Sequence, residues 1–300
     1  MSRNSFSSFY ENTAYQHFIV PFDVELDDEL LINTDNLFIS DEIGSGGAST
    51  VYQGWYDDDE VAIKFIQNYS RNNEEKENLE NNITNEINIM YRMKHKNVTE
   101  LIGASVRPGA ITIVMELLKN GSLTDYFDHL NEIDEHLHLT KSIKFALDVS
   151  TTMEYLHKGG IIHLDLKSEN LLLSDDKTTL KLADFGLAQD SSKVNEITAG
   201  KGTYKYMAPE LFNREGKKYC SNKYDIYSFS IIFWELLTTK RVYDDEDISW
   251  VKNYVLNEEG RPSLECIPVQ VIPLLERCWA TEPDKRPEFT EIIEVLSDLV

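Results

Sequence analysis

Hydrophobic residues change their spacing along this 300-residue chain, and this change is the strongest constraint on its fold. Apolar and polar residues alternate over residues 37–43 and again over residues 51–55, which predicts two β-strands. The largely apolar residues 61–66 predict a third strand. After Gly121 helical spacing dominates. A chain with its strands first and its helices afterwards is expected to form an α+β fold in two segregated parts.

The same pattern predicts three segments. Residues 1–36 are polar and then acidic, so we expect an N-terminal extension that is flexible. Residues 37–118 form the sheet-bearing part and residues 119–300 the helical part. Besides the first three strands, the sheet-bearing part is expected to contain a helix at about 78–94 and strands at 98–102 and 111–117. Helices are expected at residues 123–130, 140–158, 224–238, 247–255 and 268–279.

The net charge of −23 argues against nucleic acid and anionic membranes as partners. Acidic runs occur at residues 23–29, 57–60 and 244–247. We interpret them as solvated loops. The alternative, attraction of basic substrates, requires one run to lie beside the active site.

The cysteines and the apolar runs both favour a cytoplasmic protein. The longest apolar run, residues 229–237, is too short to span a bilayer and contains Glu235, so no membrane insertion is expected. The three cysteines, Cys220, Cys266 and Cys278, lack metal-site spacing and are interpreted as reduced thiols.

A glycine-rich turn, residues 44–47, lies between the first two predicted strands. Glycine lets backbone amides approach phosphate oxygens without obstruction by a side chain. Because a strand and not a helix follows this turn, the pattern argues against a Rossmann or Walker-type phosphate loop.

Lys64 lies within the third predicted strand, where a charge is costly to bury without a partner. It therefore needs an anion. Glu86 on the predicted helix is the preferred partner, and Glu80 and Glu100 are the alternatives.

The segment from His163 to Asn170 and the triplet starting at Asp184 concentrate reactive side chains. Asp165 is an acid that can accept a proton, and Lys167 supplies a cation. Asn170 and Asp184 carry the oxygen ligands that magnesium prefers. Together these are the groups needed to move a phosphoryl group.

These motifs, in this order, resemble the signature set of the eukaryotic protein kinase family. The late Cys-Trp…Arg-Pro pattern, residues 278–287, is similar to that of its tyrosine-kinase-like group of serine/threonine protein kinases. The resemblance covers residues 37–300. It implies a two-lobed fold, with a small antiparallel-sheet N-lobe that has one main helix and a larger helical C-lobe. It also implies transfer of the ATP γ-phosphate to Ser or Thr hydroxyls of protein substrates.

The resemblance implies a role for each reactive residue, with ATP and Mg2+ as cofactors. Asp165 orients the acceptor hydroxyl and takes its proton, and Lys167 neutralises the transferred phosphate. Lys64, held by Glu86, contacts the α- and β-phosphates. Asn170 and Asp184 bind magnesium. The residues expected to bind the nucleotide are Gly44, Gly46, Gly47, Val51, Ala62, Lys64, Met115, Glu116, Leu118, Asp125 and Leu172, with adenine at the backbone of Glu116 and Leu118 and the ribose at Asp125.

Departures from the family pattern are informative. Ser49 replaces the third glycine of the turn, and its small side chain is expected to leave room for ATP. Leu164 replaces the Arg that pairs with an activation-loop phosphate in many members. We therefore expect activity to depend little on phosphorylation of Ser191, Ser192 or Thr198, unless Lys193 or Lys201 takes over the role of that Arg.

Lys167 and Thr203 are typical of serine/threonine kinases, in which the Thr hydroxyl bonds between the catalytic Asp and the Lys. The resemblance also pairs Glu210 with Arg286 and places Asp225 against the backbone of the catalytic loop. Two other functions are open: a pseudokinase scaffold or binding module, and a kinase acting on small molecules. The first is disfavoured because Lys64 and the catalytic and metal residues are all present, and the second because of the Ala-Pro-Glu and Arg-Pro motifs.

Overall fold

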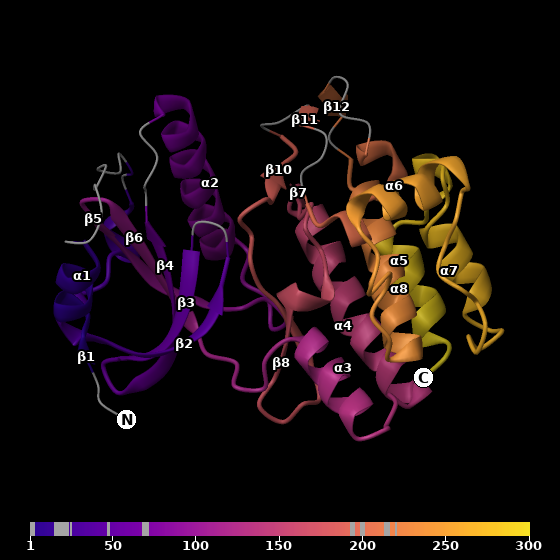
Figure 1. Cartoon of the computed structure of the whole chain (residues 1–300), viewed down its shortest axis with the longest axis horizontal. Helices are drawn as coiled ribbons and strands as arrows, with labels where there is room; N and C mark the ends of the chain where they lie inside the picture. Colours follow the sequence, from indigo (N-terminus) through magenta and orange to yellow (C-terminus); the bar gives the residue numbers. More distant parts are fainter. Residues whose placement is uncertain are drawn as a thin grey trace. The chain divides into compact units, whose positions relative to one another are not determined.

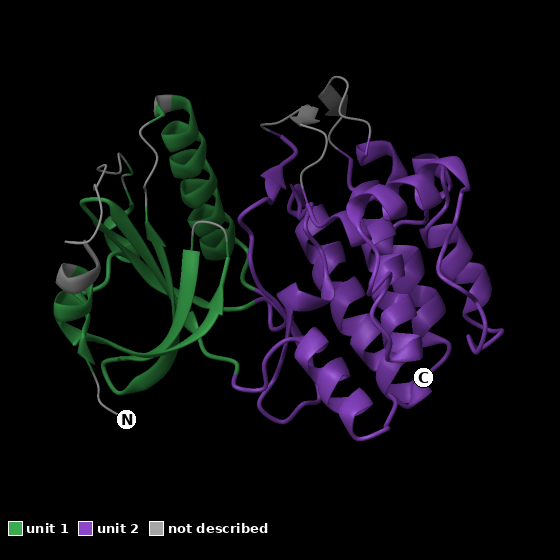
Figure 2. Ribbon diagram, viewed as in Figure 1, with its two compact units in different colours: residues 1–94, 99–118 green, residues 95–98, 119–300 purple. Residues whose placement is uncertain are grey.

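The computed structural model describes residues 4–14, 24, 26–46, 49–67, 72–192, 196–198, 202–212, 217–219 and 221–300. The chain divides into two compact units, coloured separately in Figure 2. Unit 1 is Met1–Lys94 with Thr99–Leu118, and unit 2 is His95–Val98 with Lys119–Val300. Strands with one long helix fill unit 1 and helices fill most of unit 2, which confirms the α+β prediction.

Unit 1 is built on one six-stranded sheet whose neighbouring strands are all antiparallel (Figure 1). The strand order is β1-β2-β3-β4-β6-β5. Their bounds are β1 Asn4–Ser5, β2 Leu37–Ser45, β3 Ser49–Tyr56, β4 Asp59–Gln67, β5 Leu101–Arg107 and β6 Ala110–Glu116. The predicted strand at 98–102 is displaced toward the C-terminus, because Val98 forms an isolated bridge with Leu182 in unit 2 instead.

Helix α2 (Asn73–Arg92) covers one face of this sheet. It begins before the predicted residue 78 because the side chain of Asn72 accepts a hydrogen bond from the Glu74 amide at 3.1 Å and caps the helix. Ile83 and Ile87 of α2 pack in a buried cluster with sheet residues that include Ile111.

The opposite face of the sheet is covered by α1 (Phe6–Ala14), in the segment for which we expect a flexible extension. Phe6 is 1% exposed, and its ring meets the edge of Phe65 with centroids 6.2 Å apart. Phe9 makes a similar contact with Tyr52 at 5.1 Å, and the Arg107 guanidinium lies 5.2 Å from the Phe6 ring centroid. The described part of residues 4–14 is therefore ordered, because two aromatic rings three positions apart on a helix give it an apolar face.

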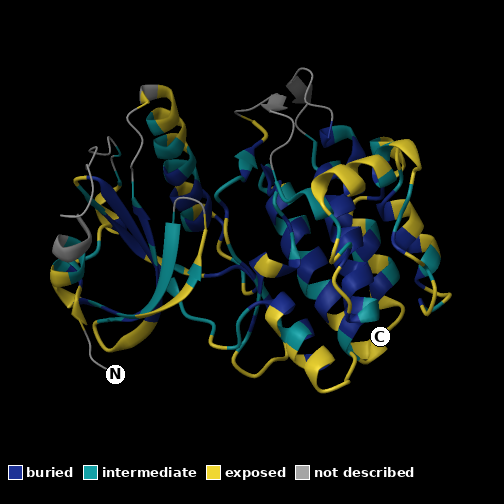
Figure 3. Ribbon diagram, in the orientation of Figure 1, coloured by how far each residue is buried: buried dark blue, intermediate teal, exposed yellow. Residues whose placement is uncertain are grey.

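Unit 2 is organised around α5 (Lys223–Thr238), in which every side chain from residue 224 to residue 236 is buried (Figure 3). A helix that is buried on all its sides lies in the interior of a domain. The surrounding helices are α3 Leu123–Glu132, α4 Leu139–Lys158, α6 Ile248–Asn257, α7 Ile272–Cys278 and α8 Phe289–Ser297. Helix α7 is shorter than the predicted 268–279, and α8 was not predicted.

Short elements complete both units. In the described part of unit 2 there are three two-stranded sheets, β8 Leu171–Leu173 with β9 Leu180–Leu182, β7 Ile161–Ile162 with β10 Gln189–Asp190, and β11 Glu196–Thr198 with β12 Lys217–Tyr219. The 3-10 helices are η1 Asp28–Leu30 and η2 Thr34–Asn36 in unit 1, and η3 Ser168–Asn170, η4 Tyr204–Tyr206, η5 Pro209–Leu211 and η6 Pro283–Lys285 in unit 2. Within the described ranges, no helix is long and apolar enough to cross a membrane.

The packing of α1 predicts that Phe6 stabilises unit 1. Replacing Phe6 with Ala should lower the free energy of unfolding by about 3 kcal/mol, because a fully buried ring is lost from the cluster. Ser8→Ala, at an exposed position of the same helix, is the matched control and should change it by less than about 0.5 kcal/mol. Urea denaturation measures both. Equal midpoints for the two variants would show that α1 does not hold to the sheet.

Candidate active site

The predicted partner of Lys64 is present in unit 1. Lys64 Nζ lies 2.6 Å from Glu86 Oε1, and the two side chains are 13% and 4% exposed. Alternation along β4 directs Lys64 to the face of the sheet that α2 covers, where Glu86 lies on the helix. The alternative Glu80 lies 3.5 Å from Lys76 instead. The structure thus confirms the choice of Glu86 among the three candidates.

The glycine-rich turn connects β2 and β3. The Gly46 amide donates to the Ser49 carbonyl at 2.8 Å, and Gly47 lies outside the described residues. A Cβ atom added at Gly44 would meet no atom within 4 Å, whereas one at Gly54 would lie 2.2 Å from the Phe38 carbonyl oxygen. Close packing therefore requires glycine at position 54 but not at position 44. The absence of a side chain at position 44 is consistent with a backbone that a ligand approaches closely.

The other expected nucleotide residues of unit 1 lie on neighbouring strands. The ladder pairs Val51 with Lys64 and Ala62 with Met115. Glu116 ends β6, and its amide donates to the Glu100 carbonyl at 3.0 Å. In this arrangement the Glu116 amide therefore donates within unit 1, and Leu118, the other backbone position expected to bind adenine, is half-buried.

In unit 2, Asp225 fixes the backbone of the catalytic loop as predicted. It lies on α5 with no exposed surface, and its carboxylate accepts hydrogen bonds from the His163 amide at 2.8 Å and the Leu164 amide at 2.9 Å. His157 Nε2 lies 2.8 Å from the same carboxylate. Burial alone would raise the pKa of Asp225, but the hydrogen bond and charge of His157 and the loop amide outweigh it and lower the pKa.

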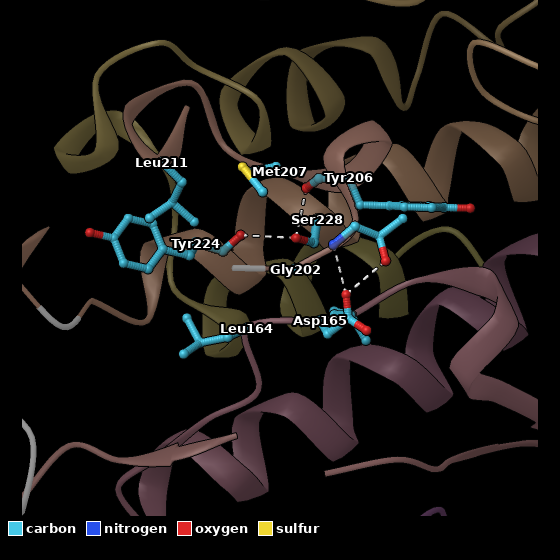
Figure 4. Close-up of a pocket in the computed structure, with 10 residues that line it drawn as sticks. Leu164, Asp165, Gly202, Tyr206, Met207, Leu211, Tyr224 and Ser228 are labelled. Atoms are coloured by element: carbon cyan, nitrogen blue, oxygen red, sulfur yellow. Dashed lines mark hydrogen bonds between the residues drawn. The ribbon is translucent and has the colours of Figure 1, made fainter. Parts of the chain in front are cut away.

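Asp165, Lys167 and Thr203 form a closed set of polar contacts. The Thr203 amide and hydroxyl both donate to Asp165 Oδ1 at 2.8 Å, drawn as dashed lines in Figure 4. Lys167 Nζ lies 2.8 Å from Asp165 Oδ2 and donates to Thr203 Oγ1 at 3.0 Å. This confirms the predicted bridging position of Thr203. Gly202 makes the approach possible, since its φ is +98° and a Cβ there would lie 2.6 Å from the Leu164 carbonyl oxygen.

Asn170 and Asp184 are brought to neighbouring positions by backbone pairing. The Ala183 amide donates to the Asn170 carbonyl at 2.8 Å, which extends the β8–β9 hairpin and sets Asp184 beside this end of it. The side-chain nitrogen of Asn170, Nδ2, donates to the Asp165 carbonyl at 2.9 Å. This bond fixes the side-chain amide, so its oxygen, Oδ1, faces another direction. Asp184 has a φ of +61°, in the left-handed region, which is uncommon outside glycine but which Asp tolerates better than most residues.

This pair fits a magnesium ion in chemistry. Both side chains offer hard oxygen ligands, and magnesium is usually held by one or two carboxylates together with substrate phosphates and water. The described residues contain no group of three or more His, Cys, Asp or Glu side chains that could hold a metal by themselves. A magnesium ion at Asn170 and Asp184 would therefore need the phosphate oxygens of a nucleotide to complete its shell.

The remaining expected nucleotide residues, Asp125 and Leu172, lie near each other in unit 2. Ser122 forms an isolated bridge with Leu172, and it caps α3 by accepting from the Asp125 amide at 3.1 Å. The Asp125 carboxylate in turn accepts from the Ser122 amide at 2.8 Å. Asp125 thus has a structural role as part of a capping box, beside the ribose contact expected of it.

A small pocket lies beside Asp165 and Thr203 (Figure 4). It is lined by Leu164, Asp165, Leu166, Gly202, Thr203, Tyr206, Met207, Leu211, Tyr224 and Ser228. Leu164, in the position where an Arg is common in the family, is 7% exposed in this wall. The apolar side chain of Leu164 is therefore buried at the position where many family members carry the guanidinium of an Arg.

The predicted pair of Glu210 and Arg286 is also confirmed. Two Arg286 nitrogens contact the two Glu210 oxygens at 2.7 and 2.8 Å, and the Arg286 side chain has no exposed surface. The same guanidinium donates to the carbonyls of Ala280 at 2.9 Å and Lys223 at 2.9 Å. This bidentate geometry ties η5, at the end of the activation segment, to α5 and η6.

Sequence reasoning missed the polar partners beneath this site. Ser168 and Tyr206 both bond to Glu235, and His157 bonds to Asp225. A signal for Glu235 was available, because a carboxylate inside the apolar residues 229–237 is costly to bury without donors. No comparable signal marks Ser168 or His157.

Comparisons with known proteins agree with this geometry. The family model "Protein kinase domain" matches residues 38–296. The chain is 35% identical to the serine/threonine/tyrosine-protein kinase HT1 of Arabidopsis thaliana over 90% of this chain and 68% of that protein. It is 36% identical to the Arabidopsis serine/threonine-protein kinase STY46 over 99% of this chain and 50% of that protein. Another Arabidopsis serine/threonine-protein kinase, STY17, is 35% identical over 100% of this chain and 51% of its own length.

The fold, the site and these matches define the class: the chain belongs to the protein kinase family, and unit 1 and unit 2 have the sheet and helical architecture of its two lobes. Within the family it belongs to the tyrosine-kinase-like group of serine/threonine protein kinases, as its motifs predict. The chain spans about two thirds of the length of one of these relatives and about half of the other two.

The pair of Glu210 and Arg286 should contribute strongly to stability. Arg286→Lys keeps the charge but loses the planar fork that reaches Glu210 and the carbonyls together, so it should lower the free energy of unfolding by about 3 kcal/mol. Arg277→Lys is the matched control, since Arg277 is 47% exposed and contacts the exposed Glu291. It should cost at most about 1 kcal/mol. Equal costs in chemical denaturation would contradict this view of the buried pair.

Proposed function

We propose that this chain is a protein serine/threonine kinase that transfers the γ-phosphate of ATP to Ser or Thr hydroxyls of protein substrates. The observation that carries the proposal is the closed set of Asp165, Lys167 and Thr203, with Asn170 bonded to the Asp165 carbonyl. A carboxylate fixed on both oxygens, a cation and an amide oxygen ligand in one loop are the parts that phosphoryl transfer requires.

The catalytic loop has one task for each residue. Asp165 accepts the proton of the acceptor hydroxyl, and the two bonds from Thr203 hold its carboxylate in one orientation. Lys167, 2.8 Å from that carboxylate, offers its charge to the phosphate in transfer. Asn170 and Asp184 would hold magnesium, which when bound neutralises charge on the phosphates.

The residues of unit 1 are proposed to hold the nucleotide. Lys64, held by Glu86 at 2.6 Å, contacts the α- and β-phosphates. Gly44, Gly46 and Gly47 let backbone amides approach the phosphates. The residues proposed to hold adenine are Val51, Ala62, Met115, Glu116, Leu118 and Leu172. Asp125 is proposed to contact the ribose.

We assign residues 37–118 to the kinase N-lobe, residues 119–300 to the C-lobe and residues 1–36 to an extension. The unpaired thiols of Cys266 and Cys278 and the use of ATP favour a cytoplasmic location. Cys220 lies outside the described residues.

Two observations favour this function over the alternatives. Lys64, Asp165 and Asp184 are all present, which disfavours a pseudokinase. The contacts of Lys167 and Thr203 favour Ser and Thr as acceptors. The relative HT1 is named a serine/threonine/tyrosine-protein kinase, so added transfer to Tyr is the second candidate.

The proposal predicts Mg-ATP-dependent incorporation of labelled phosphate into a generic basic protein substrate and into the chain itself. Asp184→Asn removes one carboxylate ligand and should reduce the rate by at least about 10²-fold. Glu276→Gln, at an exposed carboxylate of α7, is the matched control and should leave the rate unchanged. Mass spectrometry should find phosphoserine or phosphothreonine. No incorporation with ATP still bound would favour the scaffold, and phosphotyrosine alone would overturn the acceptor class.

Leu164 predicts that loop phosphorylation has little effect on activity. The apolar Leu164 side chain cannot pair with a phosphate, and in the structure it is buried in the wall of the pocket beside Asp165. Treatment with a phosphatase should therefore change the kinase rate less than about twofold, and so should Ser191→Ala and Ser192→Ala. If phosphatase treatment lowers the rate and rephosphorylation restores it, another cation must pair with the loop phosphate in place of the family's Arg. Lys193 and Lys201, the candidates for it, lie outside the described residues.

A further inference from the structure

Glu235 is a carboxylate in the centre of unit 2 that the proposed chemistry does not use. It lies on α5 and is 1% exposed. A charge at such a position is expensive unless hydrogen-bond donors surround it. Its surroundings therefore indicate what it does.

Donors from three separate segments meet at this carboxylate. The Ser168 hydroxyl donates to Oε2 at 2.5 Å, and the Tyr206 hydroxyl lies 3.0 Å from Oε2 and 3.1 Å from Oε1. The Val242 amide donates to Oε1 at 2.9 Å. Within the described part of the chain, no Lys, Arg or His side chain pairs with Glu235.

Two of these segments carry the reacting groups. Ser168 begins η3 and lies between Lys167 and Asn170. Tyr206 ends η4, and its amide donates to the Thr203 carbonyl at 3.0 Å. One side chain on α5 thus holds both the segment with Lys167 and Asn170 and the segment with Thr203.

The protonation of Glu235 is poised near neutral pH. Burial raises its pKa to about 7, against the lowering effect of the bonds from Ser168, Val242 and Tyr206. The ionisable groups that face Glu235 are Tyr206 on η4 and Glu169 on η3. The negative charge of Glu169 raises the pKa of Glu235 further. When ionised, the carboxylate accepts from all three donors. When it gains a proton, one oxygen becomes a donor, and Ser168 or Tyr206 must turn its hydroxyl.

We propose that Glu235 is a positioning residue for phosphoryl transfer, which in its ionised form holds the catalytic loop through Ser168 and the activation segment through Tyr206 in the arrangement that Asp165 needs. This inference rests on the proposed kinase function. Glu235 does not touch the reacting atoms and acts through Lys167, Asn170 and Thr203. Small displacements of such groups cost about 10²-fold in rate.

The test compares kcat and the KM for ATP in wild type, Glu235→Gln and Glu235→Ala. Loss of the side chain should lower kcat by about 10²-fold and leave the KM for ATP unchanged, because most proposed nucleotide contacts lie in unit 1. Glu235→Gln resembles the protonated acid in shape and charge. The ratio of wild-type kcat to that of Glu235→Gln should be largest at about pH 8 and approach one at about pH 6. A ratio that does not vary with pH would overturn the proposal.

Single hydroxyl deletions keep the test independent of folding. Ser168→Ala and Tyr206→Phe each remove one bond and keep the bulk of the side chain. Each should lower kcat, and together they should lower it by less than the product of the two effects, because both act through Glu235. Wild-type kcat in both variants would contradict the proposal.

Controls separate this inference from the kinase function. Wild type and Glu276→Gln must transfer phosphate, and Asp184→Asn must be slower by at least about 10²-fold. If wild type is inactive, the proposed function has failed. If it is active and Glu235→Ala, folded by circular dichroism, has the same kcat, only the role of Glu235 has failed.

Discussion

A carboxylate buried in the interior of a domain must be surrounded by donors, and this requirement organises the catalytic unit. Helix α5 is buried along nearly its whole length and carries two such carboxylates, Asp225 and Glu235. Asp225 takes two backbone amides of the catalytic loop, and Glu235 takes the hydroxyls of Ser168 and Tyr206. The chain segments that carry the reactive side chains are thereby attached to a helix that is buried along nearly its whole length.

This attachment explains how loops perform a reaction that tolerates little misplacement. The catalytic loop has few regular backbone hydrogen bonds of its own, and Leu164 adopts a φ of +66°, a strained conformation for a residue with a branched side chain. The bonds of Asp225 to the amides of His163 and Leu164 compensate for this strain. At the other end, Arg286 fixes Glu210 and so the end of the activation segment. Thr203 is held between these two anchors and meets Asp165.

The sequence predicted the part of this arrangement that hydrophobic spacing and the family motifs mark. Hydrophobic spacing predicted β2, β3, β4, β6 and the helices α2 to α6, and the family motifs predicted the partners of Lys64, Thr203 and Arg286. The sequence did not predict the ordered residues 4–14, because the stabilising contacts of Phe6 and Phe9 are made with Phe65 and Tyr52, far away in the chain. It also missed Ser168 and Tyr206 as partners of Glu235, since a hydroxyl signals a hydrogen bond but not where its acceptor lies.

The claim that α5 carboxylates hold the catalytic loop can be measured directly by amide hydrogen exchange. In the wild type, the amides of His163 and Leu164 should be among the slowest to exchange, because both donate to a carboxylate with no exposed surface. Asp225→Asn replaces one acceptor oxygen by a donor. At least one of the two amides should then exchange much faster, while the amides of α4 keep their protection. Unchanged protection of both amides in a folded Asp225→Asn variant would contradict this account.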